Sequence, residues 1–398
     1  MREIPPTAGL PLCWRDLLSL GHDFEADLAT FLDAPLPQIT CSGTAAEIIT
    51  LRSFQNGSER RQVILPAYTC PLVALAVLHC GLTPVLCDLA PDHFDLDHER
   101  LAALCGPQTL AIVVTHLGGR VANLAPVLHI AARHGAYVIE DAAQALGARW
   151  RGQPVGLAGD AGFYSLAVGK GLTTFEGGVL LARDAALRHT LRMTAAAIAG
   201  PDRRWEWRRS LELLGYALLY RPVGLALAYG WPLRRALRRG RLIEAVGDDF
   251  SDAIPLHTLG RWRRSVGARA LERLPAFLET LHAQATRRLN RLVQIDGLRV
   301  MQDADEAQGT WPFFMLLLPD QPTRDAALAQ LWHSGLGVSR LYIHALPDYP
   351  YLANRLSETD TPHARDFAAR MLTLSNSPWL GEAEFEQVCV ILERTLTP

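Results

Sequence analysis

The chain contains 398 residues with a mass of 43.8 kDa, of which 49% are hydrophobic and 20% are charged. This balance predicts a folded globular protein large enough for two packed lobes, and it excludes an extended disordered chain. The 39 basic and 41 acidic residues give a formal net charge of −2, which excludes a whole-molecule basic surface for nucleic acid.

The N-terminus and the cysteines both predict a cytoplasmic protein. The first twelve residues contain three prolines and no continuous apolar stretch, which argues against a secretory signal. The seven cysteines are scattered along the chain without a Cys-x-x-Cys pair. This pattern is typical of reduced, mostly buried thiols and favours neither a disulfide framework nor a metal site.

From about residue 40, short apolar runs alternate with stretches of helical spacing. The alternation predicts an α/β fold with a mainly parallel sheet and right-handed crossovers. Bound ligands are then expected at the carboxyl ends of the strands. The predicted strands are 63–65, 84–87, 111–114, 137–139 and 179–181, and the predicted helices include 45–54, 71–80 and 124–134.

Lys170 is the only lysine among the 39 basic residues, and all the others are arginines. Arginine can serve surface charge, ion pairs and phosphate contacts, but its guanidinium does not lose its proton. It therefore cannot replace a primary amine that must attack a carbonyl carbon. The single lysine is either a chance surface position or an amine with a chemical role. Gly169 and Gly171 beside it suit a backbone that approaches a ligand closely.

Two further motifs lie at the boundaries of predicted elements, one before a helix and one after a strand. Ser42-Gly43-Thr44 precedes the predicted helix at 45–54, so its N–H groups and hydroxyls either hold a phosphate or only cap the helix. Glu140-Asp141 directly follows the predicted strand at 137–139. An acid at this place either caps a helix or pairs with a ring nitrogen.

Residues 139–178, IEDAAQALGARWRGQPVGLAGDAGFYSLAVGKGLTTFEGG, resemble the core signature of the DegT/DnrJ/EryC1/StrS family. The resemblance continues upstream through CSGTAA, LPAYTC, CGLTPVLCDL and VVTHLGG, and in outline downstream through SRLYIHALPDYPYL. Members of this family are mostly sugar aminotransferases that use pyridoxal phosphate. The resemblance implies the fold-type I architecture, with a large α/β lobe around a mainly parallel sheet and a smaller α+β C-terminal lobe.

The resemblance implies a role for each matching residue. Lys170 would bind pyridoxal phosphate covalently and move a proton between substrate carbon and cofactor carbon. Asp141 would face the pyridine nitrogen and keep it protonated, so that the ring accepts electrons. Gln144, three residues on in a helical turn, would lie near the ring or its phenolic oxygen. The phosphate would be bound by Gly43, Thr44 and Ser165.

His116 matches the His-Leu-x-Gly segment of the family. It would support catalysis close to the cofactor, or it would be a hydrogen-bonded structural histidine. Glu176 fits the family motif, but no chemical step follows from it. Similar enzymes that remove a sugar hydroxyl carry histidine in place of the lysine, so Lys170 favours amino transfer. The implied assembly is a homodimer that uses an amino-acid donor, usually glutamate in this family, and a keto-sugar acceptor.

Two positions depart from the family pattern. An aromatic residue that stacks on the cofactor ring usually follows the Pro-x-x-Thr segment, where this chain has Cys70, and Tyr68 is the alternative. An asparagine that reaches the partner subunit's cofactor phosphate usually precedes the next helix, but residues 255–264 contain no asparagine. The candidates to replace it are His257, Arg261 and Arg263.

Residues 203–241 form an insertion in which ten arginines and two glutamates flank a mostly apolar stretch, 211–231. The stretch has about the length of a membrane-spanning helix, but Arg221-Pro222 at its centre argues against a simple span. The favoured interpretation is a broken helical hairpin that packs on the partner subunit. The alternative is a hairpin whose leucines enter the inner membrane face while arginines meet anionic headgroups.

After the insertion, residues 265–294 have the spacing of a long connecting helix and 311–319 that of a buried strand. Family resemblance brings Arg340, Tyr342 and His344 toward the cleft as substrate contacts. The predicted domains are 1–200 (large cofactor-binding domain with an N-terminal arm), 201–250 (insertion) and 251–398 (connecting helix and small domain).

Together these features predict an aminotransferase that aminates a nucleotide-linked keto sugar for polysaccharide, lipopolysaccharide or natural-product synthesis. A lipid-linked or otherwise hydrophobic ketone is the alternative acceptor. The alternative of a different class is a non-catalytic protein that keeps the fold to bind a sugar or regulate a partner. The joint presence of Lys170, Asp141 and Gln144 argues against it.

Overall fold

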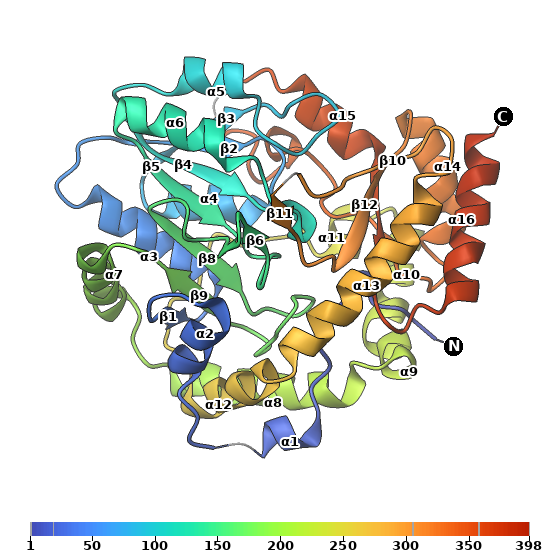
Figure 1. Cartoon of the computed structure of the whole chain (residues 1–398), viewed down its shortest axis with the longest axis horizontal. Coiled ribbons are helices and arrows are strands. Elements are labelled where there is room, and N and C mark those ends of the chain that lie inside the picture. The colour runs from blue at the N-terminus through green and yellow to red at the C-terminus, as the bar shows by residue number, and fades with distance from the viewer. Residues whose placement is uncertain (1, 19, 305, 357–358, 398) are drawn as a thin grey trace.

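The computed structural model describes residues 2–18, 20–304, 306–356 and 359–397. Its largest sheet has seven strands, in the order β1-β9-β8-β5-β4-β2-β3 (Figure 1). Neighbouring strands are parallel except around β9, which is antiparallel to β1 and β8. The strands are β1 (Gln38–Thr40), β2 (Gln62–Pro66), β3 (Thr83–Cys87), β4 (Thr109–Thr115), β5 (Tyr137–Asp141), β8 (Ala161–Ser165) and β9 (Gly178–Leu181).

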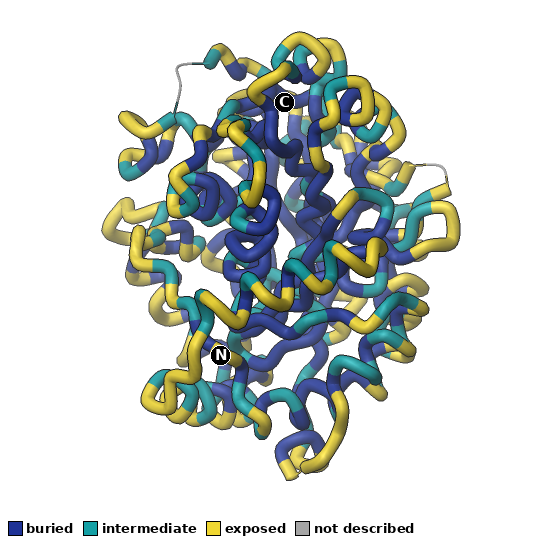
Figure 2. Tube along the Cα trace, turned by 90° about the vertical axis from the view of Figure 1, so that its left-hand side faces the viewer, coloured by how far each residue is buried: buried dark blue, intermediate teal, exposed yellow. Residues whose placement is uncertain are grey.

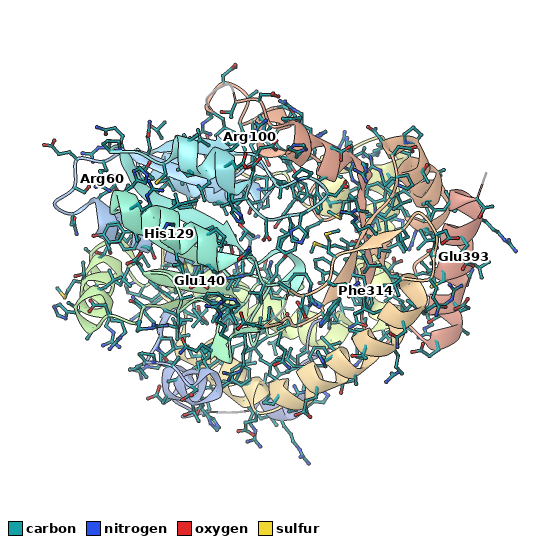
Figure 3. The ribbon with its side chains drawn as sticks, turned by 45° about the horizontal axis from the view of Figure 1, so that its top comes forward. Arg60, Arg100, His129, Glu140, Phe314 and Glu393 are labelled. Atoms are coloured by element: carbon teal, nitrogen blue, oxygen red, sulfur yellow. The ribbon has the colours of Figure 1, made fainter. Side chains whose placement is uncertain are left out.

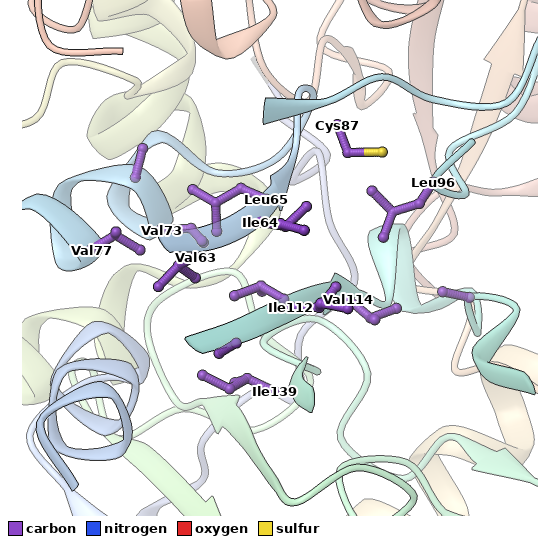
Figure 4. Close-up of a cluster of buried hydrophobic side chains, with 14 of the residues drawn as sticks. Val63, Ile64, Leu65, Val73, Val77, Cys87, Leu96, Ile112, Val114 and Ile139 are labelled. Carbon is purple, nitrogen blue, oxygen red and sulfur yellow. The ribbon is translucent and has the colours of Figure 1, made fainter. Parts of the chain in front are cut away.

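All five predicted strands are confirmed, because each apolar run forms a strand of this sheet. Strands covered on both faces are rich in Val, Ile and Leu throughout their length. Val63 and Ile64 of β2, Ile112 of β4 and Ile139 of β5 are fully buried and pack in one core (Figure 4). The sheet is mixed but mostly parallel, so the predicted fold class is correct.

Helices pack against this sheet, and the three predicted helices are confirmed as α3, α4 and α6. α3 begins where Ser42 accepts a hydrogen bond from the backbone N–H of Ala45 at 3.0 Å. α6 ends at Gly135, whose φ of 60° is a left-handed conformation that glycine adopts readily. The helices of this part are α1 (Trp14–Leu17), α2 (Phe24–Leu32), α3 (Gly43–Gln55), α4 (Pro71–His79), α5 (His98–Leu104), η1 (Leu117–Gly119), α6 (Leu124–His134) and α7 (Ala185–Ile198).

The C-terminal part contains a four-stranded antiparallel sheet, β10 (Arg299–Val300), β12 (Phe313–Leu317), β14 (Met371–Ser375) and β13 (Val338–Ser339). The predicted strand at 311–319 is confirmed as β12. The predicted connection at 265–294 forms two helices, α12 (Arg261–Leu271) and α13 (Leu274–Leu292), with Pro275 in the first turn of the second. The remaining helices are α14 (Gln321–Leu331), η3 (Leu346–Asp348), α15 (Pro362–Arg370) and α16 (Glu382–Leu396).

A three-stranded sheet connects the two parts, because β11 (Ala307–Gln308) pairs with β6 (Arg149–Trp150), which pairs with β7 (Gln153–Pro154). The N-terminal arm also connects them. Its Glu3, Ile4 and Leu10 N–H groups donate to the carbonyls of Pro222, Gly335 and Gly171 at 2.9–3.0 Å. Buried residues run through the centre of the molecule, and exposed ones lie mainly on its outer turns (Figure 2). The three-domain division remains a prediction.

The insertion is helical and breaks at Arg221-Pro222. It consists of α8 (Arg203–Leu219), α9 (Pro222–Leu225), the π-helical η2 (Ala226–Gly230), α10 (Trp231–Arg238) and α11 (Leu242–Val246). Within the described ranges no single helix is long and apolar enough to cross a membrane. The insertion has two helical arms, Arg203–Leu219 and Pro222–Arg238, which are bent by 114° relative to each other. Only the two arms together have the length and apolar composition of a membrane span.

Candidate active site

A cavity of about 410 Å³ lies at the carboxyl ends of β5 and β8, opposite the start of α3. Parallel strands direct ligand-binding groups to this edge of a sheet. The C-terminal part closes the cavity through residues that follow β13. Nine of the residues predicted from the sequence line it: Gly43, Thr44, His116, Asp141, Gln144, Ser165, Lys170, Arg340 and Tyr342.

Lys170 lies in a loop that the N-terminal arm holds in place. The Thr7 hydroxyl donates to the Gly169 carbonyl at 2.6 Å, and the Leu10 N–H donates to the Gly171 carbonyl at 3.0 Å. Burial lowers the pKa of the Lys170 ammonium below its ordinary value, although nearby Cys70 and Asp141 oppose this shift. The amine forms no hydrogen bond or ion pair with any residue that the structure describes. A lysine in this environment is more readily deprotonated and can act as a nucleophile.

Asp141 ends β5, where it pairs in register with Thr115 of β4 and Phe163 of β8. Its side chain is 3% exposed, and its Oδ1 accepts a hydrogen bond from the Ala143 N–H at 3.0 Å. Burial raises the pKa of this carboxyl, while the Ala143 hydrogen bond and the charge of Lys170 act in the opposite direction. A buried acid in this position is stabilised in its charged form by a cationic ring nitrogen.

The start of α3 and the end of β8 form the phosphate-binding candidate. Ser42 caps α3, as one interpretation of the motif required, and it also lines the cavity together with Gly43 and Thr44 in the first turn. A Cβ atom added at Gly43 would lie 3.4 Å from side-chain atoms of Phe163 and Ser165, which is an ordinary van der Waals contact. The N-terminal end of a helix favours anions through its free N–H groups and dipole.

Gln144 reaches the cavity from a different local structure than the sequence predicted. Residues 142–148 form successive turns, with i→i+3 hydrogen bonds at Ala145 and Ala148, and not the expected helical turn. The side-chain Oε1 of Gln144 accepts from the Gly118 N–H at 2.8 Å. This hydrogen bond fixes the amide at the cavity wall.

His116 is held by the protein on both ring nitrogens. Its Nε2 lies 3.0 Å from Oε2 of Glu140, and its Nδ1 accepts from the Ala122 N–H at 3.1 Å. Glu140, in the interior of the molecule (Figure 3), also accepts hydrogen bonds from the backbone N–H groups of Gly156, Ala158 and Gly159 at 2.7 Å. These contacts support the structural interpretation of His116, which borders the cavity without a free ring nitrogen.

Neither Tyr68 nor His344 is among the residues that line this cavity. The buried Tyr68 hydroxyl exchanges hydrogen bonds with the backbone of Tyr342 at 3.2 Å, and its ring packs edge-on against Tyr342. Tyr68 therefore supports the cavity wall from behind, and the structure does not place it for the predicted ring stacking. His344 borders other surface hollows. Arg340 lines the cavity but donates to the carbonyls of Ile343 and Ala368 at 2.6 and 2.8 Å.

Glu47 is a cavity residue that the motif analysis missed. It lies one helical turn after Gly43 on α3, is 1% exposed, and its Oε1 has no hydrogen-bond partner among the described residues. Burial and the neighbouring charge of Asp141 raise its pKa well above the ordinary value. The single acidic residue in the predicted helix at 45–54 was the available sequence signal.

The predicted domain 201–250 also contributes to the cavity wall, through Tyr229 of the insertion and through Val246, Gly247, Asp248 and Phe250 after it. Asp248 accepts hydrogen bonds from the Tyr349 hydroxyl at 2.6 Å and from the Ile343 N–H at 2.9 Å. Burial raises the pKa of Asp248 to about 6, although the Tyr349 hydrogen bond opposes the shift. Sequence analysis assigned no site residue to the insertion, because its wall residues follow no motif.

The candidates for replacing the partner-directed asparagine differ in their contacts. Arg263 is fully buried and donates from Nε to Glu206 at 2.9 Å and from Nη1 to the Glu176 carbonyl at 3.0 Å, so it is a structural residue of this chain. His257 is also buried, with its Nε2 3.5 Å from Glu176. Arg261 is exposed and remains the candidate able to reach another subunit.

Glu176, which had no assigned step, connects the lysine-bearing loop region to the insertion. Its carboxylate accepts from Trp205 Nε1 at 2.9 Å and from Arg209 Nε at 3.0 Å, both on α8. Burial alone would raise its pKa, but nearby His257 and the Trp205 hydrogen bond lower it below the ordinary value. Glu176 is therefore an anionic structural group.

The cavity residues fit pyridoxal phosphate. This cofactor requires an amine for its aldehyde, an acid for its ring nitrogen and N–H donors for its phosphate. Lys170, Asp141 and the start of α3 provide these groups around one cavity. Across the described residues, no cluster of three or more His, Cys, Asp or Glu side chains could hold a metal ion.

Comparison with known proteins agrees with this chemistry. The sequence profile of the DegT/DnrJ/EryC1/StrS aminotransferase family matches residues 18–218 and 262–393. GDP-perosamine synthase of Caulobacter vibrioides is 41% identical over 208 residues, which are 52% of this chain and about half (54%) of that protein. UDP-N-acetyl-3-dehydro-alpha-D-glucosamine 3-aminotransferase of Acidithiobacillus ferrooxidans is 27% identical over 94% of this chain and 88% of its own length.

The fold is also that of solved structures. A sugar aminotransferase from Streptococcus pneumoniae, determined in a pyridoxal-phosphate form, superposes with a TM-score of 0.74 at 18% identity. The superposition covers 99% of this chain and 100% of that one. At this identity the likeness supports the fold alone.

Proposed function

Because the chain belongs to the DegT/DnrJ/EryC1/StrS aminotransferase family, we propose that it moves an amino group from glutamate to a nucleotide-linked keto sugar. The observation that carries this proposal is the position of the only lysine, Lys170, in one cavity with Asp141. A non-catalytic binding protein would not require this pair.

Each site residue has a defined task in the proposed reaction. Pyridoxal phosphate, when bound, supplies the carbonyl that condenses with amines and the ring that accepts electrons. The lowered pKa of Lys170 favours a neutral amine that can take and return a proton at Nζ. Asp141 holds a proton at the ring nitrogen, and Gln144 orients the ring from a wall fixed by Gly118. Gly43, Thr44 and Ser165 bind the phosphate.

The names of two relatives, which refer to GDP and UDP, support the proposed nucleotide-linked acceptor. Arg340 and Tyr342, which line the cavity on the side of the C-terminal part, are the proposed contacts for the acceptor. We place the product in the synthesis of a surface polysaccharide, a lipopolysaccharide or a glycosylated natural product.

A lipid-linked keto sugar is the second candidate acceptor. Tyr229 of the insertion lines the cavity, and Leu227, two residues earlier, is 71% exposed on the outside of the same helix. One helix therefore separates the cavity from an apolar outer surface. This arrangement favours an acceptor whose sugar enters the cavity while its hydrocarbon part stays outside.

The proposed assembly is a homodimer in the cytoplasm. Arg261, exposed in the segment that carries the partner-directed asparagine in relatives, is the proposed contact to the partner's cofactor phosphate. All seven cysteines are free thiols, which supports a reducing compartment.

The test of the proposed function is the turnover of each keto-sugar class by the purified protein. GDP- and UDP-linked keto sugars and a lipid-linked keto sugar are supplied separately with pyridoxal phosphate and glutamate, and the aminated product is identified by mass spectrometry. Product from a nucleotide-linked sugar alone supports the first candidate, and product from the lipid-linked sugar alone supports the second. Product from neither would contradict a keto-sugar acceptor.

A further inference from the structure

The family's sequence profile matches α8 up to residue 218 but leaves residues 219–261, which include the second arm of the insertion, unmatched. In Figure 1, α8 runs along the lower edge of the molecule and α9 lies at the corner beyond its end. The two helical arms have an inner and an outer face, and the outer face carries residues with no role in the proposed reaction.

The outer face of α8 is an exposed apolar stripe. Trp207, Leu211, Leu214 and Leu218 are 69%, 48%, 37% and 60% exposed. Their spacing of four, three and four residues places them on one side of the helix. Single exposed apolar residues are ordinary, but a continuous row of large ones indicates a binding surface.

The second arm continues the stripe after the bend. Val223, Leu227 and Trp231 follow one another at intervals of four residues and are 69%, 71% and 60% exposed. Arg235 extends the row, and its guanidinium lies 5.4 Å from the centre of the Trp231 ring. We call the seven apolar residues of both arms the outer stripe.

The inner face is fixed to the rest of the chain. Leu213 and Tyr216 of α8 are buried in the core, and the Tyr220 hydroxyl accepts from the Gly9 N–H at 3.1 Å. Arg234 of α10 forms an ion pair of 2.7 Å with Glu3. A hairpin anchored in this way can lie on a membrane surface but cannot unfold from the protein to span it.

Arginines surround the outer stripe. Residues 203–241 carry a net charge of +8, so the remaining chain carries −10. Six of the ten arginines are exposed and form no ion pair with any residue that the structure describes: Arg203, Arg204, Arg221, Arg235, Arg238 and Arg239. Long arginine side chains at the border of an apolar surface reach phosphate headgroups while their stems stay in the apolar layer.

We propose that the outer stripe and its arginines dock the enzyme on an anionic lipid bilayer. Interfacial helices combine an apolar face, aromatic residues at the border and basic residues around them, as this hairpin does. Docking goes beyond the proposed amino transfer and does not depend on which keto sugar is the acceptor. Because Tyr229 lies on the inner side of the same arm, docking also holds the active-site cavity close to the bilayer.

A second copy of the chain fits this surface less well than a bilayer does. Symmetric pairing would place two outer stripes in contact, and with them two sets of unpaired arginines. An asymmetric contact with an acidic surface elsewhere would leave both ends open and extend into chains. An anionic bilayer complements the apolar and the positively charged groups at the same time.

The test is flotation of the purified full-length protein, loaded with pyridoxal phosphate, with vesicles of phosphatidylglycerol and phosphatidylcholine. The wild type is expected to bind these vesicles, to bind less as salt rises, and to bind pure phosphatidylcholine weakly. Leu218→Asp with Leu227→Asp should lower binding about tenfold or more. Arg235→Glu with Arg238→Glu should lower it by at least about fivefold for each arginine lost.

Matched controls use exposed residues outside the insertion. Met193 on α7 is 60% exposed, and Arg287 on α13 is exposed without an ion pair to a described residue, so Met193→Asp and Arg287→Glu should bind vesicles as the wild type does. Equal binding by wild type and both insertion variants would overturn the proposal. The proposal would also be overturned if the wild type does not bind vesicles and gel filtration shows that the wild type is a dimer but the leucine variant is a monomer. The spectral response of each sample to glutamate separately reports whether the proposed aminotransferase chemistry is intact.

Discussion

Nε2 of His116 lies 3.0 Å from Oε2 of Glu140, and both side chains are fully buried beside the active-site cavity. The second ring nitrogen of His116 accepts the Ala122 N–H. In the tautomer that satisfies both contacts, Nε2 carries the proton and donates it to the carboxylate. His116 therefore shapes the cavity wall as a positioning residue, because its one ring proton is donated to Glu140.

Replacing Glu140 should destabilise the fold. In the wild type, the Glu140 carboxylate accepts hydrogen bonds from His116 and from backbone N–H groups. In Glu140→Gln, the amide NH₂ would face one of these donors, so at least one buried donor loses its acceptor. We expect the free energy of unfolding to fall by about 1–3 kcal/mol, measured by denaturant titration of the apoprotein. Glu279→Gln, at an exposed position of α13, is the control and should leave it unchanged. Equal stability of both variants would contradict the buried network.

His116→Asn should leave the pH dependence of the reaction unchanged. Because the imidazole proton is used within the protein, its loss removes no titrating group from the chemistry. The rate of the glutamate half-reaction and the affinity for the cofactor should fall, while the shape of the pH–rate profile stays that of the wild type. Loss of one limb of this profile in the variant would show that His116 transfers a proton.

Glu47 should make the fold less stable as the pH rises. Its pKa is raised well above its ordinary value of 4.5, so the folded protein retains a proton that the unfolded chain releases in this window. Stability then falls as the pH rises above about 4.5, by about 1.4 kcal/mol for each unit of pKa shift. Glu47→Leu and Glu47→Gln should both remove this fall. If the stability difference between each variant and the wild type does not change with pH, the raised pKa of Glu47 is contradicted.

Asp248 should affect the acceptor more than the amino donor. It fixes Tyr349 and the Ile343 backbone beside the cavity wall, and its neighbour Phe250 lines the cavity. Asp248→Asn should raise the KM for the keto sugar about tenfold and leave the glutamate half-reaction unchanged. Asp249→Asn, at the exposed neighbouring position, is the matched control. Equal effects on both half-reactions would contradict this role.

The sequence predicted β5 and α3, which carry part of the site, because a short apolar run and helical spacing mark them. The elements it missed are short or rich in small and polar residues, such as β8, AGFYS, and the two-residue strands of the C-terminal part. The predicted helical turn at Gln144 was wrong because the chain turns repeatedly there. Spacing of three residues alone does not distinguish these two conformations.

The motif residues of the site were predictable from the family resemblance, whether they stand at a helix start, as Gly43 does, at a strand end, as Asp141 does, or in a loop, as Lys170 does. Glu47, Tyr229 and Asp248 were not, since their positions depend on how distant segments pack around the cavity. Tyr68 shows the opposite error. It lies two residues before the cavity residue Cys70, but its buried ring packs edge-on against Tyr342 behind the cavity wall, a contact between distant segments that the motif does not reveal.

The most direct test of the account is the visible absorbance of the purified protein with pyridoxal phosphate, before and after addition of glutamate. We predict an absorbance band of lysine-bound cofactor in the wild type that glutamate converts to the spectrum of the amine form. Lys170→Arg keeps the charge but should form no such band. A wild type without the band, or a Lys170→Arg variant that forms it and responds to glutamate, would contradict Lys170 as the reactive amine.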